Sequence, residues 1–172
     1  MQLNTRHFGL IEINEEDIID FPEGLPGFED VKKFIIINSY DENSPFQWLQ
    51  SIDNPELAFV IIDPRLIKNE YIVDVDTAEV EILNITDVNK VLIYSIIVVP
   101  EDITKMTANL KAPVIINTEN NKGKQVVMEN NEYTLRYCFL EGLRRSFSND
   151  SEKSNESQSS CCSEKSDSMI GG

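Results

Sequence analysis

The sequence predicts an all-β, mostly antiparallel fold: a compact β-barrel-like domain with one or two short helical turns. About ten short apolar segments alternate with turn-forming residues along the chain, a pattern typical of barrels and strongly bent sheets. Helical periodicity is thin, and the sequence shows no internal repeat. With 172 residues, of which 41% are hydrophobic, the chain is long enough for one domain with a substantial core.

The first half of the chain supplies six of the expected strands. Residues 33–38 (KFIIIN) are rich in β-branched side chains, which favour strands. Residues 46–52 and 57–63 form a pair separated by an Asp-Asn-Pro segment with good turn chemistry. The strands expected before residue 70 are 3–8, 10–13, 18–21, 33–38, 46–52 and 57–63.

The second half combines a long apolar run with shorter strands. Residues 90–99 are expected to form a central strand buried on both faces. Residues 71–75 alternate strictly, so that a strand there places Val73 and Val75 inward and Asp74 outward. The strands expected after residue 70 are 71–75, 90–99, 110–117, 125–128 and 133–140, with a polar turn at 119–123.

A short helical segment is expected over residues 76–83. Asp76 or Thr77 can cap it, because short polar side chains accept hydrogen bonds from the free N–H groups of a first helical turn. A strand is the alternative, since Val80 and Ile82 fit strand alternation equally well. We favour the helix over the strand.

A Pro/Gly-rich loop over residues 21–29 is the most distinctive local motif. Its prolines fix φ and remove donors, while its glycines permit positive φ, so a rigid bend is expected. A structural bend is the favoured interpretation, and the alternative is a binding loop that presents a rigid apolar edge to a partner. One helical turn is expected after it, over residues 29–33. The candidate binding residues of the loop are Phe21, Pro22, Gly24, Leu25, Pro26 and Phe28.

The charge divides the chain into an acidic body and a Ser-rich tail. Residues 1–145 carry 25 acidic and 13 basic residues, a net charge of −12. Residues 146–172 carry 5 acidic and 2 basic residues and contain 10 serines, with few large apolar side chains. We therefore expect one β-barrel domain over 1–145 and a disordered acidic tail over 146–172.

The composition disfavours several classes of function. A net charge of −15 repels nucleic-acid phosphates, so direct DNA or RNA binding is not expected. The single histidine, His7, has no second histidine or cysteine near it, and no phosphate-binding loop is present. We therefore expect no metal, no cofactor and no enzymatic activity. The first residues lack a secretory pattern, and the longest apolar run is about half a membrane span, so a cytoplasmic protein without membrane contact is expected.

The acidic body instead favours basic protein partners. One stretch concentrates carboxylates at alternate positions and is the second candidate binding region. Its residues are Asp74, Asp76, Glu79 and Glu81. Exposed alternating acids are a poor setting for general acid–base catalysis, because such work needs a pocket that shifts one pKa.

An ordered series of short phrases along the body resembles the flagellar assembly factor family FliW. No single phrase is diagnostic, but their order is specific, and the resemblance covers almost all of residues 1–143. The tail from residue 146 lies outside the family pattern. The matching segments are 8–9, 21–29, 45–51, 57–60, 63–64, Tyr71, 98–100 and 107–117.

The resemblance implies a β-barrel-like domain that binds two proteins in the bacterial cytoplasm. One is flagellin, held before export, and the other is CsrA, a translational regulator that represses flagellin mRNA. It further implies that flagellin binding releases the regulator, so that synthesis is coupled to export, and we expect a monomer when the protein is free. Two rival functions are a flagellin-only export chaperone and a small-molecule-binding β-barrel.

Overall fold

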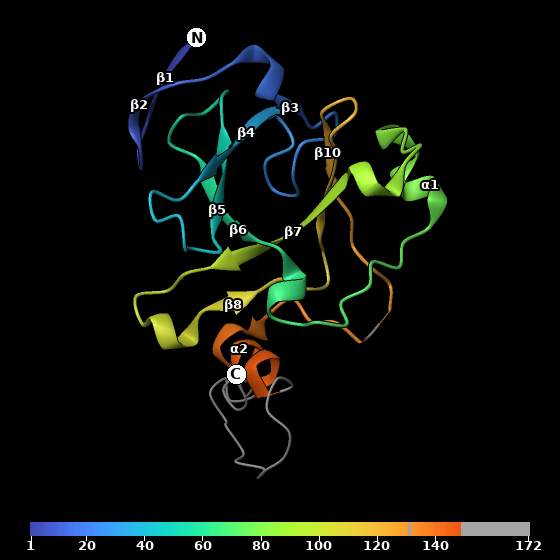
Figure 1. Ribbon diagram of the computed structural model, residues 1–172. Helices are drawn as coiled ribbons and strands as arrows, with labels where there is room; N and C mark the ends of the chain where they lie inside the picture. Colours follow the sequence, from blue (N-terminus) through green and yellow to red (C-terminus); the bar gives the residue numbers. More distant parts are fainter. Residues whose placement is uncertain (131, 149–172) are drawn as a thin grey trace, which may run out of the picture.

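Seven strands close into a barrel in the computed structural model, which describes residues 1–130 and 132–148 (Figure 1). Closure comes from two pairings that join distant segments, β3 with β10 and β7 with β9. The predicted all-β, barrel-like class is therefore confirmed. The barrel strands in spatial order are β3 (Ile19–Asp20), β4 (Lys33–Asn38), β5 (Gln47–Ser51), β6 (Ala58–Ile62), β7 (Val91–Val98), β9 (Val114–Asn117) and β10 (Lys122–Gln125).

The remaining elements lie around this barrel. In the described residues the strand pairings are antiparallel except for β3 with β10. The elements outside the barrel are β1 (Gln2–Thr5), β2 (Gly9–Glu12), β8 (Thr107–Ala108), β11 (Tyr137–Cys138), α1 (Thr77–Val80), α2 (Phe139–Ser148) and the 3-10 turns η1 (Glu15–Asp17), η2 (Pro64–Leu66), η3 (Glu81–Leu83), η4 (Val88–Lys90) and η5 (Ile103–Lys105).

Strand β7 is central to the barrel because it is long enough to pair with three other strands. Its first half pairs with β9 from Val91 to Tyr94, and its second half pairs with β6 and β8. The expected central strand over 90–99 is thus confirmed in position. The prediction that this strand is buried on both faces is wrong, since Leu92 is 39% exposed and Val98 is 60% exposed.

Apolar side chains fill the interior of the barrel. Phe21 and Phe34 are fully buried there, with ring centroids 5.0 Å apart. The members of this cluster come from almost every barrel strand and from the loop after β3. They are Ile19, Phe21, Leu25, Phe34, Leu49, Ile61, Tyr94, Val114 and Ile116. A small barrel filled in this way has little space for a ligand, which counts against the small-molecule-binding alternative.

Three further apolar clusters lie outside the barrel interior, where the hairpin β1–β2, the segment with α1 and helix α2 surround the barrel (Figure 1). The hairpin β1–β2 packs over β4 through Leu3 and Ile35. The segment that contains α1 and η3 packs over β9 through Leu83 and Ile115. Helix α2 packs through Phe139 on a third cluster, which surrounds the ends of β6 and β7.

The short helix expected over 76–83 is confirmed. Asp76 is its N-cap residue, and its carboxylate accepts a hydrogen bond from the Ala78 N–H at 3.2 Å. The α-helical part spans Thr77–Val80, and the 3-10 turn η3 continues it to Leu83, which is fully buried.

The strand expected over 71–75 is wrong, although the direction of its side chains is right. Val73 and Val75 pack inward and Asp74 is exposed, but the segment has no partner strand among the described residues. Its backbone contacts side chains instead: the Ile72 N–H donates to Tyr133 Oη at 3.0 Å. Buried and exposed side chains therefore alternate along this segment although its backbone is not hydrogen-bonded to a neighbouring strand.

The strand expected over 125–128 is also misplaced. Strand β10 begins at Lys122, inside the expected turn at 119–123, and it ends at Gln125 where a strand over 125–128 was expected to begin. Beyond Gln125 the Val126 N–H donates to the carbonyl of Pro113 at 3.0 Å. Pro113 has no N–H to return a bond, so the ladder ends.

Most of the strand expected over 133–140 is absent, because residues 133–136 form a bend and a turn and helix α2 takes the last two positions. Only Tyr137 and Cys138 of that segment pair as a strand, and the helix then runs from Phe139 to Ser148. It extends three residues past the expected domain boundary at 145, and residues 149–172 of the predicted tail lie outside the described residues. The segment expected as a helical turn over 29–33 is a non-helical turn that leads into β4.

Neither α1 nor α2, nor any 3-10 turn within residues 1–130 and 132–148, has the length and apolar character needed to cross a bilayer.

Candidate functional site

The loop between β3 and β4 is rigid because its backbone is tied at several points. The Gly24 N–H donates to the Phe21 carbonyl at 2.9 Å, and the Phe28 N–H donates to the Leu25 carbonyl at 2.7 Å. Gly24 has a φ of 70°, a left-handed conformation that favours glycine. The Lys32 ammonium closes the loop by donating to the Pro22 carbonyl at 2.9 Å.

The candidate residues of this loop divide into buried anchors and exposed surface. Phe21 and Leu25 are at most 1% exposed and belong to the barrel interior, and Gly24 is buried in the turn against the backbone of Phe28 and Glu29. Pro26 is exposed, and Phe28 is 39% exposed with its ring edge-on to Phe59 at 5.3 Å. Together with half-buried Pro22, these two are the candidate residues of the loop that another protein can touch.

The acidic segment after residue 70 lies on the surface near this loop. Asp74, Asp76, Glu79 and Glu81 are all exposed. The fold holds the segment through its apolar side chains and through side-chain hydrogen bonds rather than through a ladder, so its carboxylates point to solvent.

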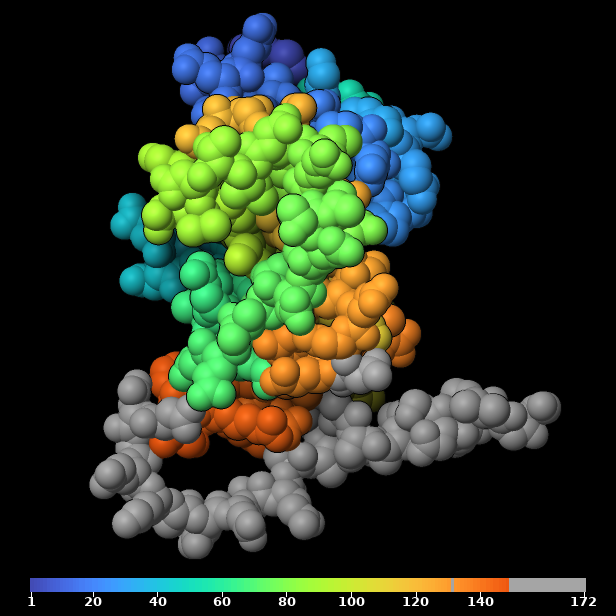
Figure 2. Space-filling view, turned by 90° about the vertical axis from the view of Figure 1, so that its right-hand side faces the viewer, coloured from blue at the N-terminus to red at the C-terminus, as the bar shows by residue number. Residues whose placement is uncertain are grey.

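One acidic groove joins the two candidate regions. It has a volume of about 670 Å³, and its walls come from the loop after β3, from the segment before and within α1, and from β10 and the residues that follow it. Figure 2 shows this face, where the green stretch around residue 75 runs beside the orange stretch after β10. The lining residues are Glu23, Asp74, Val75, Asp76, Glu79, Lys124, Gln125, Val127, Glu129 and Asn130.

Lys124 lies at the centre of the acidic groove. Its ammonium is 3.1 Å from a Glu23 carboxylate oxygen and 3.4 Å from a Glu79 carboxylate oxygen, and its side chain is only 14% exposed. Burial lowers the pKa of Lys124, but the hydrogen bonds and charges of Glu23 and Glu79 outweigh burial, so its pKa lies above the ordinary lysine value. The ammonium therefore stays charged and fixes the two acidic walls in place.

The acidic groove has an excess of negative charge. Five carboxylates and one ammonium line it, which gives a net charge of −4. Such a groove repels anions and attracts a cationic side chain or a basic protein surface. The site therefore suits binding, and the part of the chain that the structure describes contains no cluster of histidine, cysteine or carboxylate groups able to hold a metal ion.

The structure brings together Asp74, Asp76 and Glu79 of the predicted residues and leaves Glu81 outside the acidic groove. Sequence reasoning missed Glu23, Lys124 and Glu129. Glu23 lies within the recognised loop, so its position next to a candidate motif was a usable signal. No local signal marks Lys124, because it meets its partners only after β10 pairs with β3.

Comparison with known proteins gives a consistent result over the described domain. A family model described as "FliW protein" matches residues 2–139. The chain is 52% identical over 149 residues to a protein named flagellar assembly factor FliW from Thermoanaerobacter pseudethanolicus, with 87% of this chain and 99% of that protein covered. A protein of the same name from Caldanaerobacter subterraneus is 51% identical over 148 residues, with 86% and 99% covered.

A solved structure shows the same likeness in three dimensions. The crystal structure of a flagellar assembly factor FliW superposes with a TM-score of 0.75 at 37% sequence identity. The match covers 81% of this chain and 96% of that one.

Proposed function

This chain belongs to the FliW family of flagellar assembly factors, and on that premise we propose that it binds both flagellin and a CsrA-type translational regulator. Binding of the regulator would relieve repression of flagellin mRNA translation, and binding of flagellin would release the regulator. The protein would then couple flagellin synthesis to export as a non-enzymatic cytoplasmic factor that is monomeric when free and does not itself contact nucleic acid.

The acidic groove is the observation that carries the regulator half of this proposal. A protein that binds RNA presents a basic surface to the phosphates, and a groove with a net charge of −4 offers a complementary surface. Docking there adds negative charge beside the RNA-binding surface. RNA affinity then falls even where the two binding surfaces do not overlap.

The loop after β3 supports the flagellin half. Pro22, Pro26 and Phe28 form a rigid, partly apolar edge of the kind that receives an amphipathic helix. Glu23 of the same loop lines the acidic groove. Because one rigid loop contributes to both surfaces, we propose that the two partners exclude each other.

Titration of the full chain with flagellin and with the regulator, first separately and then together, tests the switch. Mutual displacement in a calorimetric or fluorescence experiment supports it. A stable ternary complex refutes the simplest form of the switch. If the chain binds flagellin and does not bind the regulator, the result supports the alternative of a flagellin-only export chaperone.

A pair of matched double variants tests the role of the acidic groove. The variant D74N/D76N removes two groove charges and keeps an asparagine at the N-cap of α1, where this residue type caps as well as aspartate. The control E81Q/D87N removes two charges outside the groove, one exposed and one half-buried, and its D87N change retains a capping side chain for η4. We expect the first variant to weaken regulator binding about tenfold at low salt, with most of the difference lost at high salt.

The control is expected to change regulator affinity less than about threefold, since charges outside the groove act only through screened long-range attraction. Equal effects of the two variants would show that net charge matters and the acidic groove does not. An unchanged affinity for both variants would remove the electrostatic contribution from the proposal.

A further inference from the structure

Strand β4 has a free hydrogen-bonding edge over its second half. On one side it pairs with β5 along its length, from Phe34 to Asn38. On the other side its pairing with β3 ends at Phe34, because the chain before β3 turns away through η1.

The alternation of backbone groups identifies which residues face this edge. The Lys33 carbonyl accepts a bond from the Ile52 N–H at 2.9 Å, so Lys33 faces β5. Successive residues of an antiparallel strand face opposite neighbours. The N–H and C=O groups of Ile36 and Asn38 therefore point away from β5, and no strand among the described residues pairs with them there.

A second groove lies along this edge and is separate from the acidic groove. Its volume is about 300 Å³. One wall is β4, and the other is the end of β2 with the residue after it. We call it the edge groove, and its lining residues are Ile11, Glu12, Ile13, Asp17, Ile35, Ile36, Ile37 and Asn38.

The edge groove combines an apolar floor with acidic rims. Ile11, Ile36 and Ile37 are half-buried and supply apolar surface that an extended segment with β-branched side chains can cover, over the buried Ile13 and Ile35. Glu12 on β2 and Asp17 on η1 add negative charge at the rims. Beyond Asn38, Asp41 and Glu42 line the adjoining pocket of the β4–β5 hairpin, so the surface stays acidic in that direction.

We propose that the edge groove binds an extended partner segment that adds a strand to β4. The partner would alternate β-branched side chains with polar ones and carry lysine or arginine at its ends. Main-chain bonds to Ile36 and Asn38 supply affinity, the isoleucines select apolar side chains, and the carboxylates of Glu12 and Asp17 select basic flanks. The unpaired backbone groups and the charge of the rims favour such a segment over a helix.

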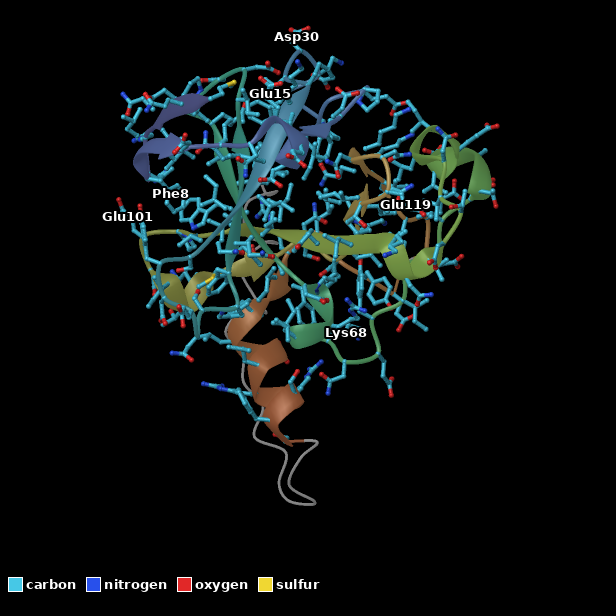
Figure 3. The ribbon with its side chains drawn as sticks, turned by 45° about the horizontal axis from the view of Figure 1, so that its top comes forward. Phe8, Glu15, Asp30, Lys68, Glu101 and Glu119 are labelled. Atoms are coloured by element: carbon cyan, nitrogen blue, oxygen red, sulfur yellow. The ribbon has the colours of Figure 1, made fainter. Side chains whose placement is uncertain are left out.

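This surface is distinct from the acidic groove and does not depend on the proposed partners. Figure 3 shows the end of the molecule that carries η1, with Glu15 of that turn labelled. The two grooves share no lining residue. Neutralising Asp74 and Asp76 is therefore expected to leave strand addition unchanged.

The test uses a capped heptapeptide, Lys-Val-Thr-Val-Thr-Val-Lys, and measures amide hydrogen exchange of the full chain by NMR. At a peptide concentration of about ten times Kd, exchange of the Ile36 and Asn38 amides should slow about tenfold, because only the free state exchanges. A peptide with proline at its central position cannot complete the ladder and serves as the probe control. No slowing with up to about 1 mM peptide, the weak end of measurable affinity, would overturn the proposal.

A matched pair of variants at Asn38 tests the geometry. N38P removes the outward N–H at the end of an edge strand, where proline is tolerated, and N38A keeps that N–H. We expect N38P to weaken the peptide about five- to tenfold relative to N38A, as expected for one main-chain bond. Equal affinities for the two variants would contradict strand addition at this edge.

Charge reversal supplies a readout that does not touch the strand. E12K/D17K should weaken the peptide more than tenfold and should restore binding of a peptide with glutamate at both ends, while E101K, outside the edge groove, serves as the control. Protection of Ile36 and Asn38 that appears with increasing protein concentration, without peptide, would assign the edge to a second copy of this chain and refute the peptide partner.

Discussion

The two candidate binding regions meet in one groove, but the fold holds them by different means. The loop over residues 21–29 is fixed through the barrel interior by Phe21 and Leu25 and through its backbone by glycine geometry. The segment over 71–81 rests on the outside of the barrel, held by Val73, Val75 and scattered hydrogen bonds. The loop therefore contributes side chains to the barrel interior, whereas the acidic segment packs against the outer surface of the barrel.

Because of this difference, substitutions in the two regions should affect different properties, namely stability for the loop and binding for the acidic segment. Changes in the loop should act first on the stability of the barrel, because its anchors fill the interior. Changes in the acidic segment should act on binding and leave stability nearly unchanged, because exposed carboxylates contribute little to folding. Substitutions in the two regions can test this separation, from the largest expected effect to the smallest.

Truncation of the loop anchor should produce the largest loss. Phe21→Ala removes a fully buried ring that contacts Phe34, and we expect the free energy of unfolding to fall by about 3–5 kcal/mol in urea denaturation. Phe28→Ala, at a ring that is 39% exposed, is the control and should cost roughly 1–2 kcal/mol. Equal losses would mean that the loop is not anchored through the interior.

Backbone geometry predicts the second effect. An alanine at Gly24 requires a left-handed φ and places its Cβ 2.7 Å from the Phe28 carbonyl oxygen. Gly24→Ala should therefore cost about 2–4 kcal/mol, from strain and from a clash with backbone that cannot move aside. Gly27→Ala has a similar φ of 87° with nothing within 4 Å of the new Cβ, so it should cost only about 1–2 kcal/mol.

Thermal or chemical denaturation of both glycine variants measures this contrast. A cost at Gly24 no larger than that at Gly27 would show that the loop relaxes to admit the methyl group. The loop would then be no more rigid than the acidic segment.

Local patterns predicted the barrel class and its best-defined strand. The β-branched run of β4 was assigned with correct bounds at both ends, because a strand with this composition is recognisable without knowing its partners. A cap at Asp76 or Thr77 was also predicted, and Asp76 provides it; such a cap depends on residues two positions apart.

The errors arose where a distant partner decides the structure. Residues 71–75 alternate like a strand, yet no strand of the described chain lies beside them, and alternation alone does not report the presence of a partner. Helix α2 was missed because its apolar residues also fit the continuation of a strand. Within the site, Lys124 was missed because its two carboxylate partners come from residues 23 and 79, far from it in the sequence.

Lys124 is where the rigid loop and the acidic segment are linked, and its removal should have an intermediate effect. Lys124→Met deletes ion pairs to two glutamates that are each 57% exposed, so solvent screening limits the loss to roughly 1 kcal/mol. The groove becomes more negative, and regulator affinity should rise about threefold at low salt. A fall in affinity, with the fold intact, would show that Lys124 positions the groove walls for binding.

The pH dependence of this ion pair has a definite sign. The folded-state pKa of Lys124 is raised, so its contribution is fully present below the ordinary lysine pKa of 10.5 and is lost as the pH rises through the folded value. The difference in unfolding free energy between wild type and Lys124→Met should therefore stay constant from pH 7 to about pH 9. A difference that disappears within that range would mean that the pKa of Lys124 is not raised.

The smallest effect on stability is expected for neutralisation of the acidic segment. D74N/D76N keeps the α1 cap and removes two of the groove's five carboxylates. The small loss of attraction to Lys124 is offset by weaker repulsion among the remaining carboxylates. We expect the free energy of unfolding to change by less than about 0.5 kcal/mol while regulator binding weakens. A stability loss as large as that of Gly24→Ala would show that the acidic segment belongs to the folding unit as firmly as the loop does, and the separation between the two regions would fail.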